Sequence, residues 1–245
     1  MPAVAAHALF GQAVFAHLPL PIQHHLSTHD SYWTLGFQGP DLLFYHKPLS
    51  KTPIAAYGSA LHEKNPVAFF QDAPWDDPRQ VAYLLGFACH YCLDRACHPL
   101  VNETAHFQST PHRLIESAFD LHLLTKANLP LTRKKFIPRL PFYAPIAMAY
   151  GLPSSTIKHC GHNFHRYTGV LDHPKLVSLA KKPSFSSLCL PAAPAYPQTC
   201  QQLDTLFQQA IPTAVTLVTK LYQWAEEGHP FPCCLSENFE GVVPE

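Results

Sequence analysis

Two segments of the sequence carry histidines and carboxylates at the spacing of one helix face. In HYCLDRACHP, His90, Asp94 and His98 follow one another at four-residue intervals. At about 100° per residue, their side chains lie within about 80° of one another on a helix. His112 and Glu116 repeat the four-residue interval in the next expected helix. Two antiparallel helices that face each other would bring these five side chains into one pocket.

The mixture of imidazole nitrogen and carboxylate oxygen indicates zinc or a related divalent ion, because calcium prefers oxygen ligands alone. A single histidine four residues before an aspartate is more often a surface pair or a hydrogen-bonded core histidine. Here two such pairs occur, and one of them has a third ligand in register. The segment around Asp94 is also strongly apolar, and a buried unpaired carboxylate costs free energy that a bound cation would offset. The spacing therefore predicts a metal site.

The elements that would position these residues are helical. Apolar side chains recur at helical intervals along most of the chain, and alternating strand patterns are scarce. The dipeptide His98-Pro99 is expected to end the helix that carries Asp94, because proline disrupts a helix interior. The expected helices span 3–18, 79–97, 111–128 and 200–227, with weaker ones at 139–150, 154–168 and 172–180.

The predicted fold is all-α, a single compact multi-helix domain with its metal cluster between the central helices. No sharp shift in composition marks a domain boundary along the 245 residues. Within this one domain we expect a metal-binding core at about 5–125, a helical C-terminal part at 126–228 and a short tail at 229–245.

Composition excludes several classes of protein. The chain has 17 Lys and Arg, 17 Asp and Glu and 17 His, so its formal net charge of zero argues against a polybasic nucleic-acid binder. A hydrophobic fraction of 47% is enough for a folded core rather than disorder. The most apolar run, Val81–Cys89, is much shorter than the ~20 residues of a membrane span.

The N-terminal segment and the cysteines predict the compartment. The first residues lack the basic region of a secretory signal, and the eight cysteines have no regular spacing. We therefore expect a cytoplasmic protein, in which Cys89 and Cys92 are buried or free thiols rather than metal ligands.

Four segments, in this order, resemble the bacterial zinc-dependent phospholipase C family. The resemblance runs from about residue 5 to about residue 125, and the four segments together make it specific. It implies an all-helical fold around two or three zinc ions, shared with certain zinc-dependent single-strand nucleases. The segments are LGFQGPDLLFY at 35–45, YGSALHE at 57–63, AYLLGFACHYCLDRACHPLV at 82–101 and HRLIESAFDLHLL at 112–124.

The resemblance also implies a ligand set. Asp94 would bridge two metals, and Asp41 would assist proton removal as well as ligate, so these two acids are the candidate catalytic residues. One metal would be held by Asp41, His62, His90 and Asp94, a second by His98, His112 and Glu116, and the remnant of a third by His7 with Asp94.

The third metal site departs from the family pattern. In secreted members it is completed by the N-terminal tryptophan of the mature enzyme, and no such tryptophan precedes His7. Either Met1 or Pro2 supplies a terminal amine, or the third site is weak or empty. We expect two zinc ions.

The implied function is hydrolysis of phosphate esters by a metal-activated water, as in a phospholipase C-type phosphodiesterase. A nuclease or phosphatase on the same fold is one alternative, and a non-catalytic protein whose zinc only holds the helices together is another. The expected substrate is a phospholipid or another phosphodiester. We expect at most peripheral contact with a membrane and no specific nucleic acid.

Residues beside the expected ligands have open roles. Asp120 follows Glu116 by four residues, so it either orients a ligand histidine or is a solvated surface acid. Phe44 and Tyr45 are close to Asp41 in sequence and are expected at the substrate mouth, although an aromatic stripe is more often core.

Overall fold

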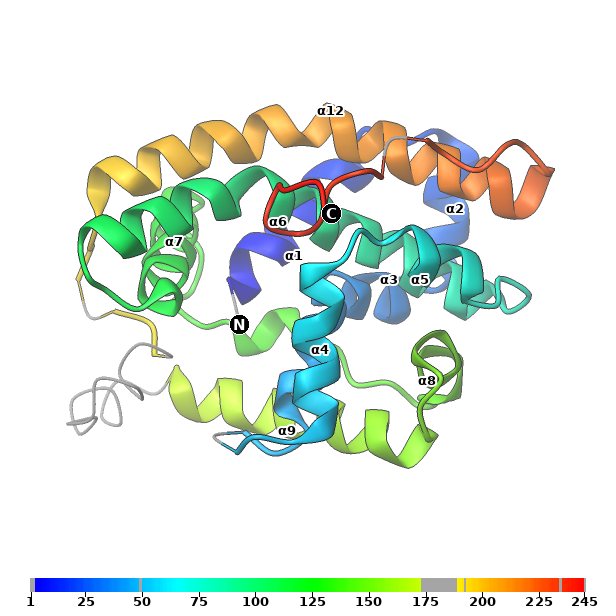
Figure 1. The fold of residues 1–245 in the computed structure, drawn as a ribbon, viewed down its shortest axis with the longest axis horizontal. Coiled ribbons are helices and arrows are strands. Elements are labelled where there is room, and N and C mark those ends of the chain that lie inside the picture. The colour runs from blue at the N-terminus through cyan, green and yellow to red at the C-terminus, as the bar shows by residue number, and fades with distance from the viewer. Residues whose placement is uncertain (1–2, 49, 173–188, 192, 234, 245) are drawn as a thin grey trace.

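The computed structural model describes residues 3–48, 50–172, 189–191, 193–233 and 235–244 (Figure 1). Over these residues the fold is all-α, as predicted, and contains no strand. The helices are α1 Val4–Phe15, α2 Leu20–Thr28, α3 Asp30–Gly36, η1 Gly39–Tyr45, α4 Pro53–Glu63, α5 Val67–Asp72, α6 Pro78–Phe107, α7 His112–Lys126, η2 Lys134–Phe136, α8 Ala144–Tyr150, α9 Ser154–Leu171 and α12 Pro197–Glu227.

Helix α6 is the central element of the fold. Asp77 caps its first turn by accepting a hydrogen bond from the Arg79 N–H at 2.9 Å, and every residue from Gln80 to Asp94 is buried. Helices α3 and α12 pack along it, and α1 and α7 complete the surroundings of its second half (Figure 1). A helix buried on all sides places its polar residues in the interior, so His90 and Asp94 must find partners there.

Two glycines let α3 cross α6 at very short range. A Cβ atom on Gly86 would lie 2.3 Å from the Trp33 carbonyl oxygen, and one on Gly36 would lie 2.3 Å from that of Tyr83. No side chain fits at either position without moving a main chain. The close crossing brings the Phe37 carbonyl, just beyond α3, within 3.0 Å of His90 Nδ1.

The predicted end of this helix at His98-Pro99 was wrong, because α6 continues to Phe107. Pro99 removes one helical N–H, at a cost of about 3 kcal/mol in an isolated helix. Packing opposes that cost, because Val101 and Thr104 are buried in the added turns. The C-terminal segment covers α6 at Pro99, because a Cβ on Gly241 would lie only 3.0 Å from both the Arg95 oxygen and Pro99 Cγ.

Other helix predictions held with shifted ends. The helices expected at 3–18, 111–128 and 200–227 correspond to α1, α7 and α12, whereas the one expected at 139–150 begins only at Ala144. The helix expected at 172–180 falls almost wholly outside the described residues. Helices α2 to α5 and the short η1 and η2 were not predicted.

The segment 235–242 does not extend away from the domain. It folds back over α6 beside the end of α4 (Figure 1), where the Phe239 N–H donates to the His62 carbonyl at 3.3 Å and the Tyr91 hydroxyl donates to the Glu237 carbonyl at 3.0 Å. The division of the chain into a core, a helical part and a tail stays a prediction. Among the described helices, none combines the length and apolar character needed to cross a membrane.

Candidate metal centre

The eight side chains expected as ligands converge between five elements. Helix α6 contributes three of them from consecutive turns, and each other element adds one or two from a different direction. They are His7 on α1, Asp41 on η1, His62 on α4, His90, Asp94 and His98 on α6, and His112 and Glu116 on α7. Local helical spacing aligns the residues within α6 and within α7, and only packing brings the other three to them.

Asp94 lies at the centre of the cluster and is 4% exposed. Its Oδ1 is 3.1 Å from His7 Nε2 and 3.3 Å from His98 Nε2. Its Oδ2 is 2.9 Å from His90 Nε2 and 3.7 Å from His62 Nε2. Burial alone would raise the pKa of Asp94, but the surrounding imidazoles outweigh burial and hold that pKa well below its usual range. One ionised carboxylate therefore faces four imidazoles.

Three groups of ligand atoms each lie within 4.8 Å of one another. One group is Asp41, His62 and His90, and a second is His98, His112 and Glu116. The third joins His7 to His90 and Asp94. The structure thus brings together the residues of each expected set, while the binding of metal by each of them stays a prediction. Met1 and Pro2, expected as a source of a terminal amine, lie outside the described residues.

The orientation of the imidazoles fits a metal. His62 Nδ1 lies 2.8 Å from the Gly58 carbonyl, and His90 Nδ1 lies 3.0 Å from the Phe37 carbonyl. Each acceptor requires a proton on Nδ1, which leaves the Nε2 lone pair for a metal. His98 and His112 have polar partners at Nδ1 as well. Five imidazoles and three carboxylates form a donor set suited to zinc.

His7 differs from the other four histidines. Its Nδ1 is buried without a hydrogen-bond partner among the described residues, while its ring stacks on His90 at a centroid distance of 4.1 Å. Burial lowers the pKa of His7 most, and repulsion from His90 lowers it further. The neutral imidazole that results is the form that binds metals.

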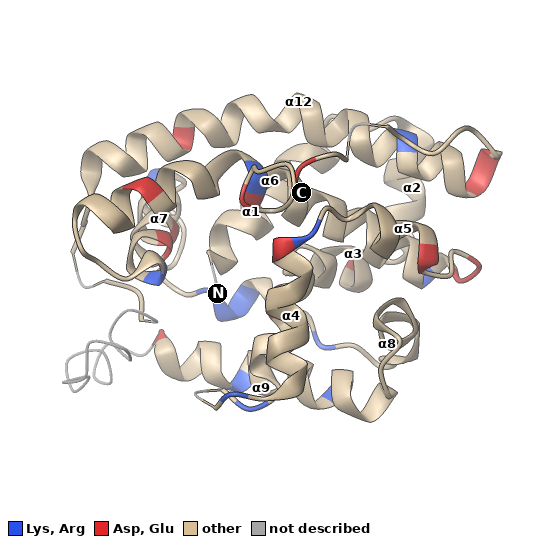
Figure 2. Ribbon diagram, viewed as in Figure 1, with Lys and Arg blue, Asp and Glu red and all other residues tan. Residues whose placement is uncertain are grey.

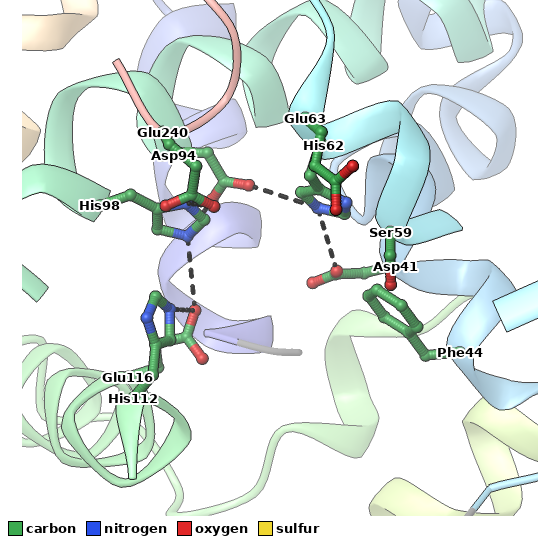
Figure 3. A pocket seen from close by; sticks show the side chains of 10 residues that line it. All are labelled: Asp41, Phe44, Ser59, His62, Glu63, Asp94, His98, His112, Glu116 and Glu240. Carbon is green, nitrogen blue, oxygen red and sulfur yellow. Dashed lines mark hydrogen bonds and ion pairs between the residues drawn. The ribbon is translucent and has the colours of Figure 1, made fainter. Parts of the chain in front are cut away.

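A cavity of about 230 Å³ opens onto the cluster (Figure 3). Its volume far exceeds the space that one water needs. It is lined by Asp41, Phe44, Ser59, His62, Glu63, Asp94, His98, His112, Glu116 and Glu240.

The two aromatic residues expected at the substrate mouth lie in different surroundings. Phe44 lines the cavity beside Asp41, as expected (Figure 3). Tyr45 follows the core alternative, because its ring is buried against Phe164 at a centroid distance of 4.4 Å. Phe44 and Tyr45 are adjacent on η1, but their side chains point in different directions. A position close to Asp41 in sequence was therefore not enough to predict which of them lines the cavity.

Asp120 takes neither of its two expected roles. It is completely buried, and its Oδ1 accepts the Ala6 N–H at 2.8 Å, next to His7. Burial raises its pKa to about 8, against the opposing effect of Arg133. Asp120 therefore secures the first turn of α1 instead of orienting a ligand histidine or facing solvent.

Sequence reasoning missed Asn102 and Glu240. Asn102 Oδ1 lies 2.7 Å from His112 Nδ1, and Glu240 Oε1 lies 3.2 Å from His98 Nδ1. Asn102 continues the four-residue row of His90, Asp94 and His98, and that signal was hidden by the assumed helix end at Pro99. No periodic pattern in the segment around Glu240 links it to the histidines.

The cysteines of the CxxC pair are buried in α6, as expected for Cys89 and Cys92.

Fold and site together define an all-helical protein with a candidate metal centre at a surface cavity. A family model described as zinc dependent phospholipase C matches residues 6–163, and the chain therefore belongs to that family. The match contains all eight expected ligands and extends past the four segments that first indicated it. Zinc dependence is a property of the family. Comparisons with curated proteins and with solved structures gave no match.

Proposed function

We propose that the protein is a zinc-dependent hydrolase of phosphate esters, acting as a phospholipase C-type phosphodiesterase. The observation that carries the proposal is that six of the eight expected ligands, all except His7 and His90, line an open cavity of about 230 Å³. Structural zinc sites are closed by four protein ligands, whereas catalytic sites keep a position for water or substrate. An accessible cluster with a shared carboxylate at Asp94 favours chemistry over structural support alone.

The residues divide into two principal subsites. His98, His112 and Glu116 would hold one zinc ion, and Asp41, His62 and His90 would hold the other, with Asp94 between them. When bound, zinc supplies Lewis-acid activation of the phosphate ester and lowers the pKa of the attacking water.

Asp41 is the residue best placed to accept a proton from that water. Its carboxylate lines the cavity and lies 3.4 Å from His62 Nε2. Burial by itself raises the pKa of Asp41, but nearby positive groups, among them His62, outweigh burial and hold that pKa below its usual range. Asp41 is therefore ionised, which is the form that both a metal ligand and a proton acceptor require.

The lining of the cavity favours a single phosphodiester over a polyanion. Among its described lining residues there is no Lys or Arg, and Figure 2 shows those residue types spread over several helices. Further phosphates of a nucleic acid would instead meet Glu63 and Glu240 at the cavity. Phe44 offers an apolar surface beside Asp41, which suits the non-phosphate part of a phospholipid.

Hydrolysis assays with a panel of substrates test the proposal. Zinc-loaded protein is incubated with a chromogenic phosphocholine diester, a simple phosphate diester, a phosphate monoester and single-stranded DNA. We expect the phosphocholine diester to be cleaved fastest, the activity to vanish with a chelator, and zinc to restore it. Zinc-loaded protein that cleaves none of the substrates would contradict the proposal and favour a structural role for the metal.

A further inference from the structure

The two histidines of the His98–His112–Glu116 group are joined by one chain of hydrogen bonds on the side away from Glu116. His98 Nδ1 lies 3.2 Å from Glu240 Oε1, and the Asn102 side-chain amide donates to Glu240 Oε2. The oxygen of the same amide lies 2.7 Å from His112 Nδ1. Asn102 and Glu240 thus connect the outer nitrogens of both imidazoles.

The acceptors in this chain fix the protons on the two Nδ1 atoms. A carboxylate only accepts, so His98 Nδ1 and the Asn102 amide nitrogen must both donate to Glu240. Asn102 Oδ1 then faces His112 Nδ1, which must also carry a proton. In the neutral rings the lone pairs are therefore on Nε2, which lies 3.6 Å from Glu116 Oε1 in His98 and 3.2 Å from it in His112. The network selects the tautomer that a metal needs at both histidines.

Glu240 is held in place independently of the histidines. The Asn238 side-chain oxygen accepts the N–H groups of Glu240 and Val242, each at 3.0 Å, and its amide donates to the Glu63 carbonyl at 3.3 Å. Glu237 pairs with Arg95 on α6 at 3.0 Å. These contacts attach the backbone of the segment to both α4 and α6 without using the side chain of any expected metal ligand.

We propose that Glu240 and Asn102 are positioning residues of the His98–His112–Glu116 metal subsite, and that the C-terminal segment 235–244 is part of the metal centre. The segment lies beyond the family match, which ends at residue 163. The inference rests on zinc binding as set out under the proposed function.

The variant Glu240→Gln tests the role of the carboxylate with little change of shape. The replacement amide offers one acceptor oxygen, so His98 or Asn102 loses its partner. The Glu240 side chain is 33% exposed, so the change does not disturb the apolar core. Glu237→Gln is the matched control, because it changes an acid in the same segment that contacts Arg95 rather than a histidine.

Zinc affinity is measured on the intact protein by competition with a chromogenic chelator. We expect Glu240→Gln to lower the affinity for one zinc ion about 10- to 100-fold, the usual effect of losing a partner of a ligand histidine. The affinity for another zinc ion should stay unchanged. Glu240→Asp should recover part of the loss. Glu237→Gln should bind zinc like the wild type. Glu240→Gln combined with Asn102→Ala should lose little more than either change alone, because both break one chain.

Thermal unfolding separates positioning from general stability. Metal-free wild type and Glu240→Gln should unfold at similar temperatures, while zinc should raise the Tm of the variant less than that of the wild type. Equal zinc affinity in wild type and Glu240→Gln would overturn the role of Glu240 and leave the proposed function intact. An equal loss in Glu237→Gln would also overturn it, by showing that attachment of the segment is what matters. Wild-type protein that binds no zinc would overturn both proposals.

Discussion

His7 Nε2 lies 3.1 Å from Asp94 Oδ1, which ties the first helix of the chain to the centre of the metal cluster. The same Asp94 oxygen is 3.3 Å from His98 Nε2. Asp120 helps to hold α1 in this position, because its carboxyl accepts the N–H of Ala6, the residue before His7. The N-terminal helix is thus part of the site, and its docking can be tested apart from the central ligands.

Replacement of the shared carboxylate should disrupt both principal subsites. We expect wild-type protein purified without added metal to hold at least two zinc ions per chain, and Asp94→Asn to lower that number and abolish phosphodiester hydrolysis. The reason is that four imidazoles lose the carboxylate that they share. Elemental analysis with a protein assay measures the ratio. Asp77→Asn is the control, because it changes the cap of the same helix and should keep the zinc.

His7 should matter less for zinc than the ligands of the principal subsites. We expect His7→Leu to leave two tightly bound zinc ions, because His7 belongs to neither Asp41–His62–His90 nor His98–His112–Glu116. The exposed His17, just after α1, provides the control variant His17→Leu. A zinc content below two in His7→Leu would show instead that His7 is a ligand of a principal site.

Asp120 should make stability fall as pH rises. Its carboxyl stays protonated in the folded protein up to about pH 8, whereas the ordinary pKa of 3.8 applies in the unfolded chain. Between these values unfolding releases a proton, so the free energy of unfolding decreases with pH by at most about 1.4 kcal/mol per unit. We expect Asp120→Asn to remove this dependence. The stability of wild type relative to the variant should therefore decline from pH 4 to pH 8.

Denaturant unfolding in the presence of a chelator measures this effect without the contribution of bound metal. The exposed Asp30 offers a control, since Asp30→Asn should keep the wild-type dependence on pH. Parallel curves for wild type and Asp120→Asn would show that the buried carboxyl is ionised throughout.

The close crossing of α3 and α6 should tolerate no side chain. Gly86→Ala would place a Cβ 2.3 Å from the Trp33 oxygen, and we expect it to destabilise the protein by about 1–3 kcal/mol. Zinc binding should weaken as well, because α3 positions the Phe37 carbonyl against His90. Gly169→Ala in α9 is the control, since it meets mainly the flexible Lys134 side chain. Equal stability of the two variants, measured by thermal unfolding, would contradict this account.

Sequence periodicity was informative where the geometry is local. The row His90, Asp94, His98 and the pair His112, Glu116 follow from the helical repeat, because residues four apart share a face whatever the tertiary fold. His7, Asp41 and His62 could be expected only through the resemblance to the family. Each comes from a different element, and no spacing along the chain relates them to α6.

The prediction failed where long-range packing outweighed a local preference. Pro99 normally ends a helix, but burial of Val101 and Thr104 keeps α6 helical beyond it. That continuation places Asn102 beside His112. Asp120 was expected near a histidine or in solvent, and the docking of α1 gives it a main-chain partner instead.

The sequence by itself determined the all-helical class, the family and the expected ligand set, because residue types and helical repeats are written along the chain. Only the tertiary structure decided that Asp94 faces four imidazoles at once and that Glu240, far along the chain, completes the surroundings of His98. The physical reason is that a hydrogen bond or metal ligand requires atoms to approach within a few ångströms. Packing between helices, which no local repeat encodes, sets those distances.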